Sequence, residues 1–126
     1  MRTCLVAVAV LLWSGAVEAQ TLSYSQAKSR ADESEGRLSP NEMQRLVEAQ
    51  GKFAGGAFAR CVSRTGSAPT NFTVVVEVGL DGRVKDSWLR GESSFAHCFR
   101  ERMVAEFSFR PSSLPFFTAF AYTHAP

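Results

Sequence analysis

The sequence predicts an α+β fold, in which a helix is followed by a β-hairpin, a second helix and a terminal strand. A small antiparallel sheet would pack on the two helices, and one disulfide would join them. Three observations predict this fold. Apolar residues recur at helical spacing from about residue 40 to residue 62 and again from residue 95 to residue 107. Between these segments, apolar and polar residues alternate on both sides of a turn that reads LDG. Each helical segment contains one cysteine.

The first residues, 1–19, have the pattern of a secretory signal peptide. Arg2 supplies a positive charge, the apolar run CLVAVAVLLW follows, and VEA precedes Gln20 as a small-residue cleavage site. A membrane anchor is the less favoured alternative, because the apolar run is shorter than the roughly twenty residues that span a bilayer. Cleavage would leave a periplasmic or secreted chain with no stable membrane insertion.

Residues 20–38 follow the predicted signal peptide and read QTLSYSQAKSRADESEGRL. They are rich in serine and charged residues and almost free of large apolar side chains. Such a segment buries too little apolar surface to offset the entropy that ordering costs. We therefore expect a flexible polar leader here and a folded domain over residues 39–126.

The first predicted helix begins after Ser39. The sequence SPNE places Ser39 at the N-cap, Pro40 at the first helical position and Glu42 where a capping box requires an acidic side chain. Helical spacing of apolar residues then continues to about Val62. The adjacent glycines near its middle indicate either a kink or a place where another element packs closely.

The hairpin follows, and its first strand has one clearly buried face formed by Phe72 and three valines at alternate positions. The loop LDG is expected to hold Gly82 in the left-handed conformation. Asp86 then falls on the apolar face of the second strand, which indicates either a β-bulge or an edge strand with a relaxed pattern. The expected pairs are Val78 with Val84, Glu77 with Lys85 and Val74 with Trp88.

A second amphipathic helix follows the loop GESS, with Phe95, Phe99, Met103 and Phe107 at every fourth position. The segment SFRPSSLP ends this helix, and FFTAFAYTH is typical of a closing strand. The side chains on one face of that strand are Phe116, Phe120 and Tyr122, and those on the other are Phe117, Ala119 and Ala121.

Signal cleavage would remove Cys4 and leave Cys61 and Cys98 in an oxidising compartment. A disulfide between them is the favoured interpretation, and closing the loop would stabilise the fold by about 4 kcal/mol. The alternatives are two buried reduced thiols, or a reactive Cys98 beside His97. Adjacent residues on a helix point about 100° apart, so this neighbour pair has no dyad geometry.

Composition and spacing exclude several classes of function. The net charge is +2 and no basic tract is present, so nucleic acid is not expected as a partner. His97 and His124 have no metal-ligand spacing to cysteines or carboxylates, so neither a metal nor a cofactor is expected. No catalytic motif is present, and we do not expect an enzyme.

The segment from Asn71 to His124 contains an ordered set of motifs: an aliphatic strand, the turn DGRV, a second strand, the loop GESS, a helix, the exit FSFRP and a final strand. This set resembles the carboxy-terminal domain of TonB and its periplasmic relatives, the TonB/TolA-type superfamily, over about half of the chain. The resemblance implies a small antiparallel sheet backed by helices. It also implies that a partner peptide adds a strand to a sheet edge. A cleaved chain that lacks a long Pro-rich spacer would not transmit force from an inner-membrane motor by itself, and its cysteine pair resembles that of a stand-alone relative.

These features predict an exported, non-catalytic protein-interaction module that binds a protein of the cell envelope through a sheet edge, with a homodimer as another use of that edge. The alternative is an inhibitor or immunity protein against a secreted enzyme, with RGESSF at residues 90–95 as its loop. The aromatic residues of the last strand are also consistent with ordinary core packing. The residues predicted to contact the partner are Trp88, Leu89, Arg90, Phe117, Phe120 and Tyr122.

Overall fold

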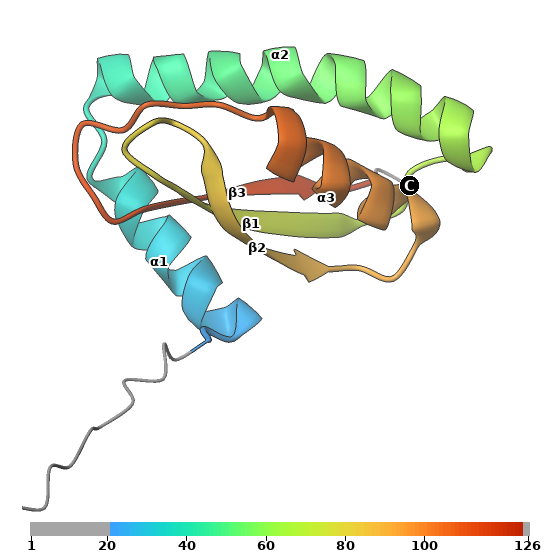
Figure 1. Ribbon diagram of the computed structural model, residues 1–126, viewed down its shortest axis with the longest axis horizontal. Helices are drawn as coiled ribbons and strands as arrows, with labels where there is room; N and C mark the ends of the chain where they lie inside the picture. The colour runs from blue at the N-terminus through green and yellow to red at the C-terminus, as the bar shows by residue number, and fades with distance from the viewer. Residues whose placement is uncertain (1–20, 125–126) are drawn as a thin grey trace, which may run out of the picture.

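The computed structural model describes residues 21–124 and confirms the α+β fold (Figure 1). The predicted signal peptide, residues 1–19, lies outside the described residues. Three strands form one antiparallel sheet in the order β2-β1-β3, so β2 and β3 are its two edges. In chain order the elements are α1 (Tyr24–Gly36), α2 (Pro40–Thr65), β1 (Phe72–Val78), β2 (Val84–Arg90), α3 (Ser94–Glu106) and β3 (Phe116–Tyr122).

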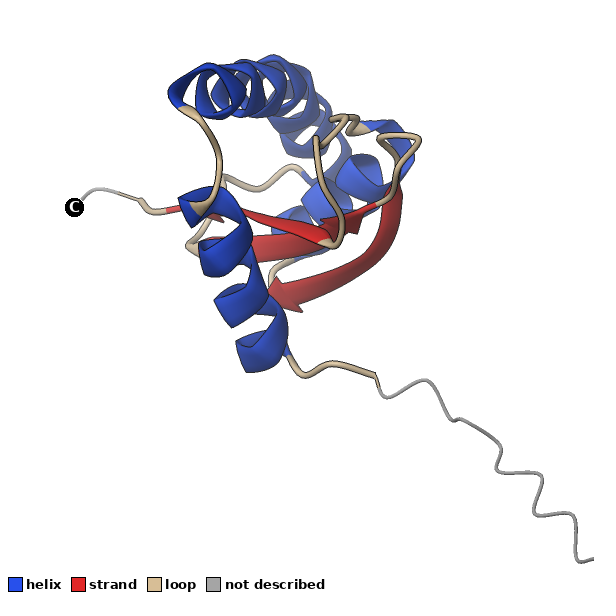
Figure 2. Ribbon diagram, turned by 90° about the vertical axis from the view of Figure 1, so that its left-hand side faces the viewer, coloured by secondary structure: helices blue, strands red, loops and turns tan. Residues whose placement is uncertain are grey.

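The helices are divided between the two faces of the sheet (Figure 2). α2 and α3 cover one face, and α1 crosses the other. The larger apolar core lies beneath α2 and α3, where Val74 and Val76 of β1 meet phenylalanines of α3. A smaller core beneath α1 contains Val75 and Phe117. The central strand is therefore buried on both faces.

The prediction of a flexible leader over residues 20–38 is wrong, because most of this segment forms α1. A capping box starts the helix: the Ser23 hydroxyl accepts a hydrogen bond from the Gln26 N–H, and the Gln26 side chain accepts one from the Ser23 N–H. Packing of α1 on the sheet supplies stability that its polar composition does not predict. The face that it buries consists of small side chains, Ala27, Ala31 and Ser34.

The predicted start of α2 is confirmed. The Ser39 hydroxyl accepts a hydrogen bond from the Glu42 N–H, and the Glu42 carboxylate accepts one from the Ser39 N–H. The helix runs to Thr65, slightly beyond its predicted end, and Gly66 closes it in the left-handed conformation with φ of 66°. α2 is therefore one continuous helix that packs over the sheet and α3.

The turn between β1 and β2 is the predicted three-residue loop. Gly82 has φ of 84°, in the left-handed region, and Val78 pairs with Val84 as expected. The Gly79 N–H donates to the Arg83 C=O at 2.9 Å and closes the loop. The turn residues, together with the apolar match of Val78 and Val84, were therefore sufficient to predict this part of the hairpin.

Beyond the turn, the predicted pairs of Glu77 with Lys85 and Val74 with Trp88 are wrong. A β-bulge between β1 and β2 leaves Lys85 as an extra residue, which shifts the register by one. The shift moves Asp86 away from the apolar face. The β-bulge and the edge position of β2 together explain why Asp86 did not fit the predicted alternation of apolar and polar residues. The observed pairs are Glu77 with Asp86, Val75 with Trp88 and Val74 with Leu89.

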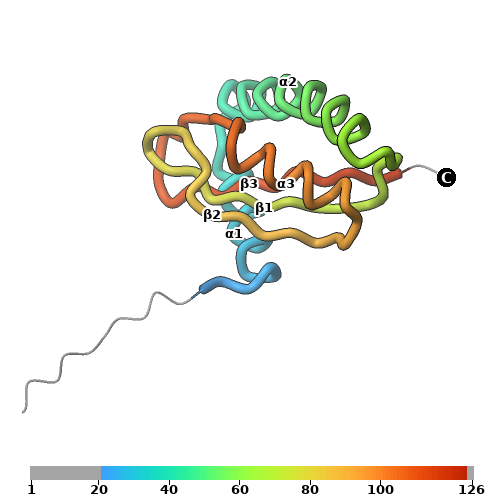
Figure 3. The backbone as a smooth tube through the Cα atoms, turned by 45° about the vertical axis from the view of Figure 1, so that its right-hand side comes forward, coloured from blue at the N-terminus to red at the C-terminus, as the bar shows by residue number. Residues whose placement is uncertain are grey.

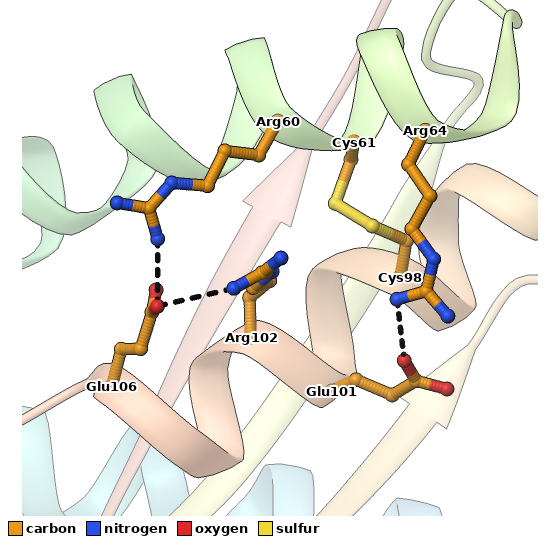
Figure 4. Close-up of polar contacts among 7 residues, drawn as sticks. All are labelled: Arg60, Cys61, Arg64, Cys98, Glu101, Arg102 and Glu106. Carbon is orange, nitrogen blue, oxygen red and sulfur yellow. Dashed lines mark hydrogen bonds and ion pairs between the residues drawn. A yellow bond between two sulfur atoms is a disulfide. The ribbon is translucent and has the colours of Figure 1, made fainter.

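The predicted disulfide between Cys61 and Cys98 is present and joins α2 to α3 (Figure 4). Both cysteines are buried, with 0% and 4% of their surface exposed. The ion pairs that flank the disulfide have exposed side chains and contribute little by themselves. These ion pairs are Arg64 with Glu101 at 3.0 Å and Arg60 with Glu106 at 2.6 Å. The disulfide and the packing of Phe58 on Phe95 and Phe99 therefore join the two helices.

The second predicted helix and the terminal strand are also confirmed as α3 and β3. Within residues 21–124, no helix is long and apolar enough to cross a membrane. The same residues contain no group of three or more His, Cys, Asp or Glu side chains placed to hold a metal ion.

Candidate functional site

The side chains predicted to contact a partner are divided between the two faces of the sheet. Leu89, Phe120 and Tyr122 pack against the core beneath α2 and α3. Trp88 and Phe117 belong to the smaller core beneath α1. Because the two groups lie on opposite sides of the sheet, they do not form one continuous surface.

The start of α1 occupies the side chains of Trp88 and Arg90. The Trp88 Nε1 donates a hydrogen bond to the Leu22 C=O at 2.8 Å. The Arg90 guanidinium lies 4.5 Å from the centre of the Tyr24 ring, in cation–π contact. A partner that used these two side chains would first have to displace this segment of the protein's own chain.

The aromatic side chains of β3 make the contacts of core residues. Phe117 is 2% exposed. The Phe120 ring stacks on Phe99 with centroids 4.8 Å apart, and Tyr122 lies 5.2 Å from the Phe58 ring. These contacts agree with the core-packing interpretation of β3 and leave its backbone as the part that a partner would use.

Side chains from α1 and α2 close the outer edge of β3. The Phe117 N–H, which points away from β1, donates to the Ser34 hydroxyl of α1 at 3.1 Å. Two residues further along β3, the Ala119 C=O accepts a hydrogen bond from the Gln50 Nε2 of α2 at 3.4 Å. Gln50 also donates to the Thr118 hydroxyl at 3.0 Å. Because an added strand would bond to these same backbone groups, the β3 edge is already occupied at Phe117 and Ala119.

Glu35, near the carboxyl end of α1, adds to this closure. The Thr118 hydroxyl donates to the Glu35 carboxylate at 3.2 Å. Burial raises the pKa of Glu35 above its ordinary value, while the Thr118 bond and nearby Lys28 oppose the rise. The link between α1 and β3 therefore includes a half-buried group whose charge depends on pH.

On the opposite edge of the sheet, α3 covers β2 at Ser87. Arg100 of α3 donates from Nη2 to the Ser87 C=O at 3.1 Å and from Nε to the Ser87 hydroxyl at 2.9 Å. The Asp86 carboxylate accepts a hydrogen bond from the Ser87 N–H at 2.8 Å. Both backbone groups of Ser87 therefore point away from β1 and are bonded within the chain.

Leu89 is the next residue of β2 whose backbone groups point outward, because alternate residues of an antiparallel strand face the same neighbour. Its side chain packs against the core. Among the described residues 21–124, neither the N–H nor the C=O of Leu89 has a hydrogen-bond partner on its outer side. The β2 edge is therefore open at Leu89, whereas the β3 edge is closed at Phe117 and Ala119 and open at Ala121, its last outward-facing residue.

Sequence reasoning missed the three side chains that close the β3 edge, Ser34, Glu35 and Gln50. The first two fall in the segment predicted to be a flexible leader. Gln50 lies in a correctly predicted helix, but no pattern in the sequence distinguishes it from a solvated polar residue. The buried small residues of α1 were the one available signal that this segment packs on the sheet.

Comparisons of the chain with protein-family models, with curated proteins and with solved structures found no match. The resemblance to TonB carboxy-terminal domains stays a prediction from the sequence motifs.

Proposed function

We propose that the protein is an exported, non-catalytic interaction module that binds a protein of the cell envelope by strand addition at the β2 edge. The observation that carries this proposal is the difference between the two edges: the chain's own side chains close β3 at Phe117 and Ala119, and Leu89 leaves β2 open. An unpaired strand edge is a template for pairing with another chain. The resemblance of the sequence to TonB carboxy-terminal domains supports the same mode of binding.

Arg100 limits how far a partner strand can pair along β2. A partner residue opposite Leu89 would form two backbone hydrogen bonds with it, one to the N–H and one to the C=O. Pairing at Ser87 would require Arg100 to release the Ser87 C=O. A short open edge also protects the free protein from edge-to-edge aggregation.

The disulfide supports the exported location in this proposal. Disulfides persist in oxidising compartments such as the periplasm and are rare in the cytosol. The bond between Cys61 and Cys98 is buried, as expected of a structural disulfide. The predicted signal peptide leads to the same location.

The inhibitor alternative is less well supported, because it requires a projecting loop at residues 90–95. In the structure, Gly91 and Glu92 lead directly from β2 to Ser93, the N-cap of α3. The Ser93 hydroxyl accepts a hydrogen bond from the Ala96 N–H at 3.1 Å, and Phe95 is fully buried. This connection is short and anchored at its α3 end.

The test is a pull-down from envelope extract with the oxidised mature protein as bait, beside Leu89→Pro. Proline removes the N–H that an added strand would use. Ala121→Pro is the matched control for the opposite edge, since Ala121 is exposed and is the outward-facing residue of β3 that no side chain of the described residues covers. We expect a specific envelope protein that the wild type and Ala121→Pro retain and Leu89→Pro loses, with circular dichroism showing that both variants are folded.

Arg100→Ala provides a second test that does not depend on losing binding. Removing this side chain frees the Ser87 C=O and lengthens the open edge, so binding or homodimerisation should increase. Equal retention of the partner by all variants would contradict strand addition at β2. Retention of a secreted hydrolase by all of them would support the inhibitor alternative.

A further inference from the structure

An open cavity of about 920 Å³ lies at the end of the sheet where the β1–β2 turn meets the segment that leads into β3. The two segments lie side by side, as Figure 1 and Figure 3 show, and the Phe109 N–H donates to the Gly82 C=O at 2.9 Å. Leu80 and Leu114 line the cavity with 76% and 49% of their surfaces exposed. Two exposed leucines around one cavity are suited to holding an apolar side chain.

Two charged residues of this cavity, Asp81 and Arg110, make no ion pair with a described residue. Glu77 and Lys85 are paired at 3.9 Å. Asp81 accepts a hydrogen bond from the Arg83 N–H at 3.1 Å within the turn. Arg110 lines the cavity and makes no ion pair with any described residue of the chain. The cavity therefore combines an apolar surface with a guanidinium that is free to bind a carboxylate.

The direction of β2 indicates which end of a peptide would reach this cavity. β2 starts at the turn and runs away from it, so a strand added antiparallel to β2 would run toward the turn. To reach Lys85, which lies on β2 and also lines the cavity, its carboxyl end would pass Ser87, and Arg100 would release the Ser87 C=O. This step rests on the proposed function and on antiparallel pairing, because it assumes that a partner strand pairs with β2 in that direction.

We propose that the cavity binds the carboxy-terminal residue of an extended peptide. The apolar side chain of that residue lies between Leu80 and Leu114, and its terminal carboxylate pairs with Arg110. The backbone of β2 supplies binding energy that does not depend on the partner's sequence, and the cavity selects a partner with a free, apolar carboxyl end.

The test uses N-acetyl-L-leucine as the probe and N-acetyl-L-leucinamide as its uncharged counterpart, titrated into isotope-labelled mature protein. A ligand of about a dozen non-hydrogen atoms is expected to bind in the millimolar range. Amide shifts should change at the turn, residues 79–82, and around residues 110–114. The carboxylate probe should bind about threefold more tightly than the amide, the range expected for one exposed ion pair.

Arg110→Gln should bring the ratio of the two affinities to about one, and Leu80→Ser should weaken both probes several-fold. Arg83→Gln is the matched control, because it removes the same charge from the adjoining β1–β2 turn at a residue that does not line the cavity. Arg83→Gln should keep the preference for the carboxylate. Leu89→Pro should also bind both probes normally, so the cavity and strand addition are tested separately. Shift changes outside the cavity, or equal affinities for the two probes in the wild type, would overturn the proposal.

Discussion

The hydroxyl of Ser34 in α1 accepts a hydrogen bond from the backbone N–H of Phe117 in β3, at 3.1 Å and away from solvent. Phe117 is the first outward-facing residue of β3 bonded in this way, and an added strand would need the same N–H. The bond therefore fastens a helix to the sheet and occupies one of its two edges at the same time.

Ser34→Ala should destabilise the protein by about 1–3 kcal/mol, because the buried Phe117 N–H would lose its only described partner. Ser29→Ala is the matched control, since Ser29 is exposed on the same helix. The control should be neutral or slightly stabilising, as alanine is the better helix former. Denaturant unfolding of the three proteins measures the differences. Equal stability of Ser34→Ala and wild type would show that this bond contributes nothing.

Glu35 should make the stability of the protein depend on pH. Burial raises the pKa of Glu35 above its ordinary value of 4.5, against the opposing Thr118 bond and Lys28, while Asp32 adds to the rise. The folded protein therefore holds this proton to a higher pH than the unfolded chain does. The contribution of Glu35 to the free energy of unfolding should fall as pH rises from about 4.5 through the folded pKa, and stay constant above it.

Glu35→Gln removes this titration and keeps an acceptor for the Thr118 hydroxyl. The free energy of unfolding of the variant minus that of wild type should increase with pH over the same interval. Urea unfolding at a series of pH values measures this difference, with Glu33→Gln on the exposed side of α1 as the control for loss of a negative charge. A difference that is independent of pH would contradict the role assigned to Glu35.

The sequence was informative where a residue type has one common structural use. Ser39, Pro40 and Glu42 predict a helix start, and Gly82 predicts the left-handed position of a turn. The cysteine pair predicted the link between α2 and α3. Each of these features is local, or needs only an even count of cysteines, so it can be read without knowing the tertiary contacts.

The capping-box residues Ser23 and Gln26 mark the start of α1, but its packing on the sheet could not be predicted in this way, because its buried face is formed by Ala27, Ala31 and Ser34. Small residues occur as often on solvated surfaces, and only their contact with Val75 and Phe117 makes them part of a core. The sequence could not predict which strand edge is open for the same reason. The outcome depends on which polar side chains of the helices reach the outer backbone groups of β2 and β3.

The disulfide should supply a large part of the stability of the domain. The two cysteines are 37 residues apart, and closing such a loop contributes about 4 kcal/mol in the chain-entropy model. Replacing Cys61 and Cys98 together by alanine should lower the free energy of unfolding by roughly that amount. A reductant should destabilise the wild type and leave the double variant unchanged. If the reductant destabilised both proteins equally, its effect would not arise from this bond.

Two glycines should respond to alanine in opposite directions. Gly91 has φ of 138°, and an added Cβ would lie 2.9 Å from the Phe72 Cβ, so Gly91→Ala should destabilise the protein by about 1–3 kcal/mol. Gly55 is exposed in α2, and an added Cβ there would meet nothing within 4 Å. Gly55→Ala should therefore stabilise the protein by up to about 1 kcal/mol, through helix propensity alone.

The unfolding midpoints of Gly91→Ala, Gly55→Ala and wild type in guanidinium chloride, all with the disulfide intact, measure this contrast. Gly55→Ala serves as the control, because it adds the same methyl group without a steric conflict. Stabilisation by both substitutions would mean that the connection from β2 to α3 tolerates a side chain at Gly91. That result would also weaken the argument that the open part of the β2 edge is short, because β2 ends where this anchored connection to α3 begins.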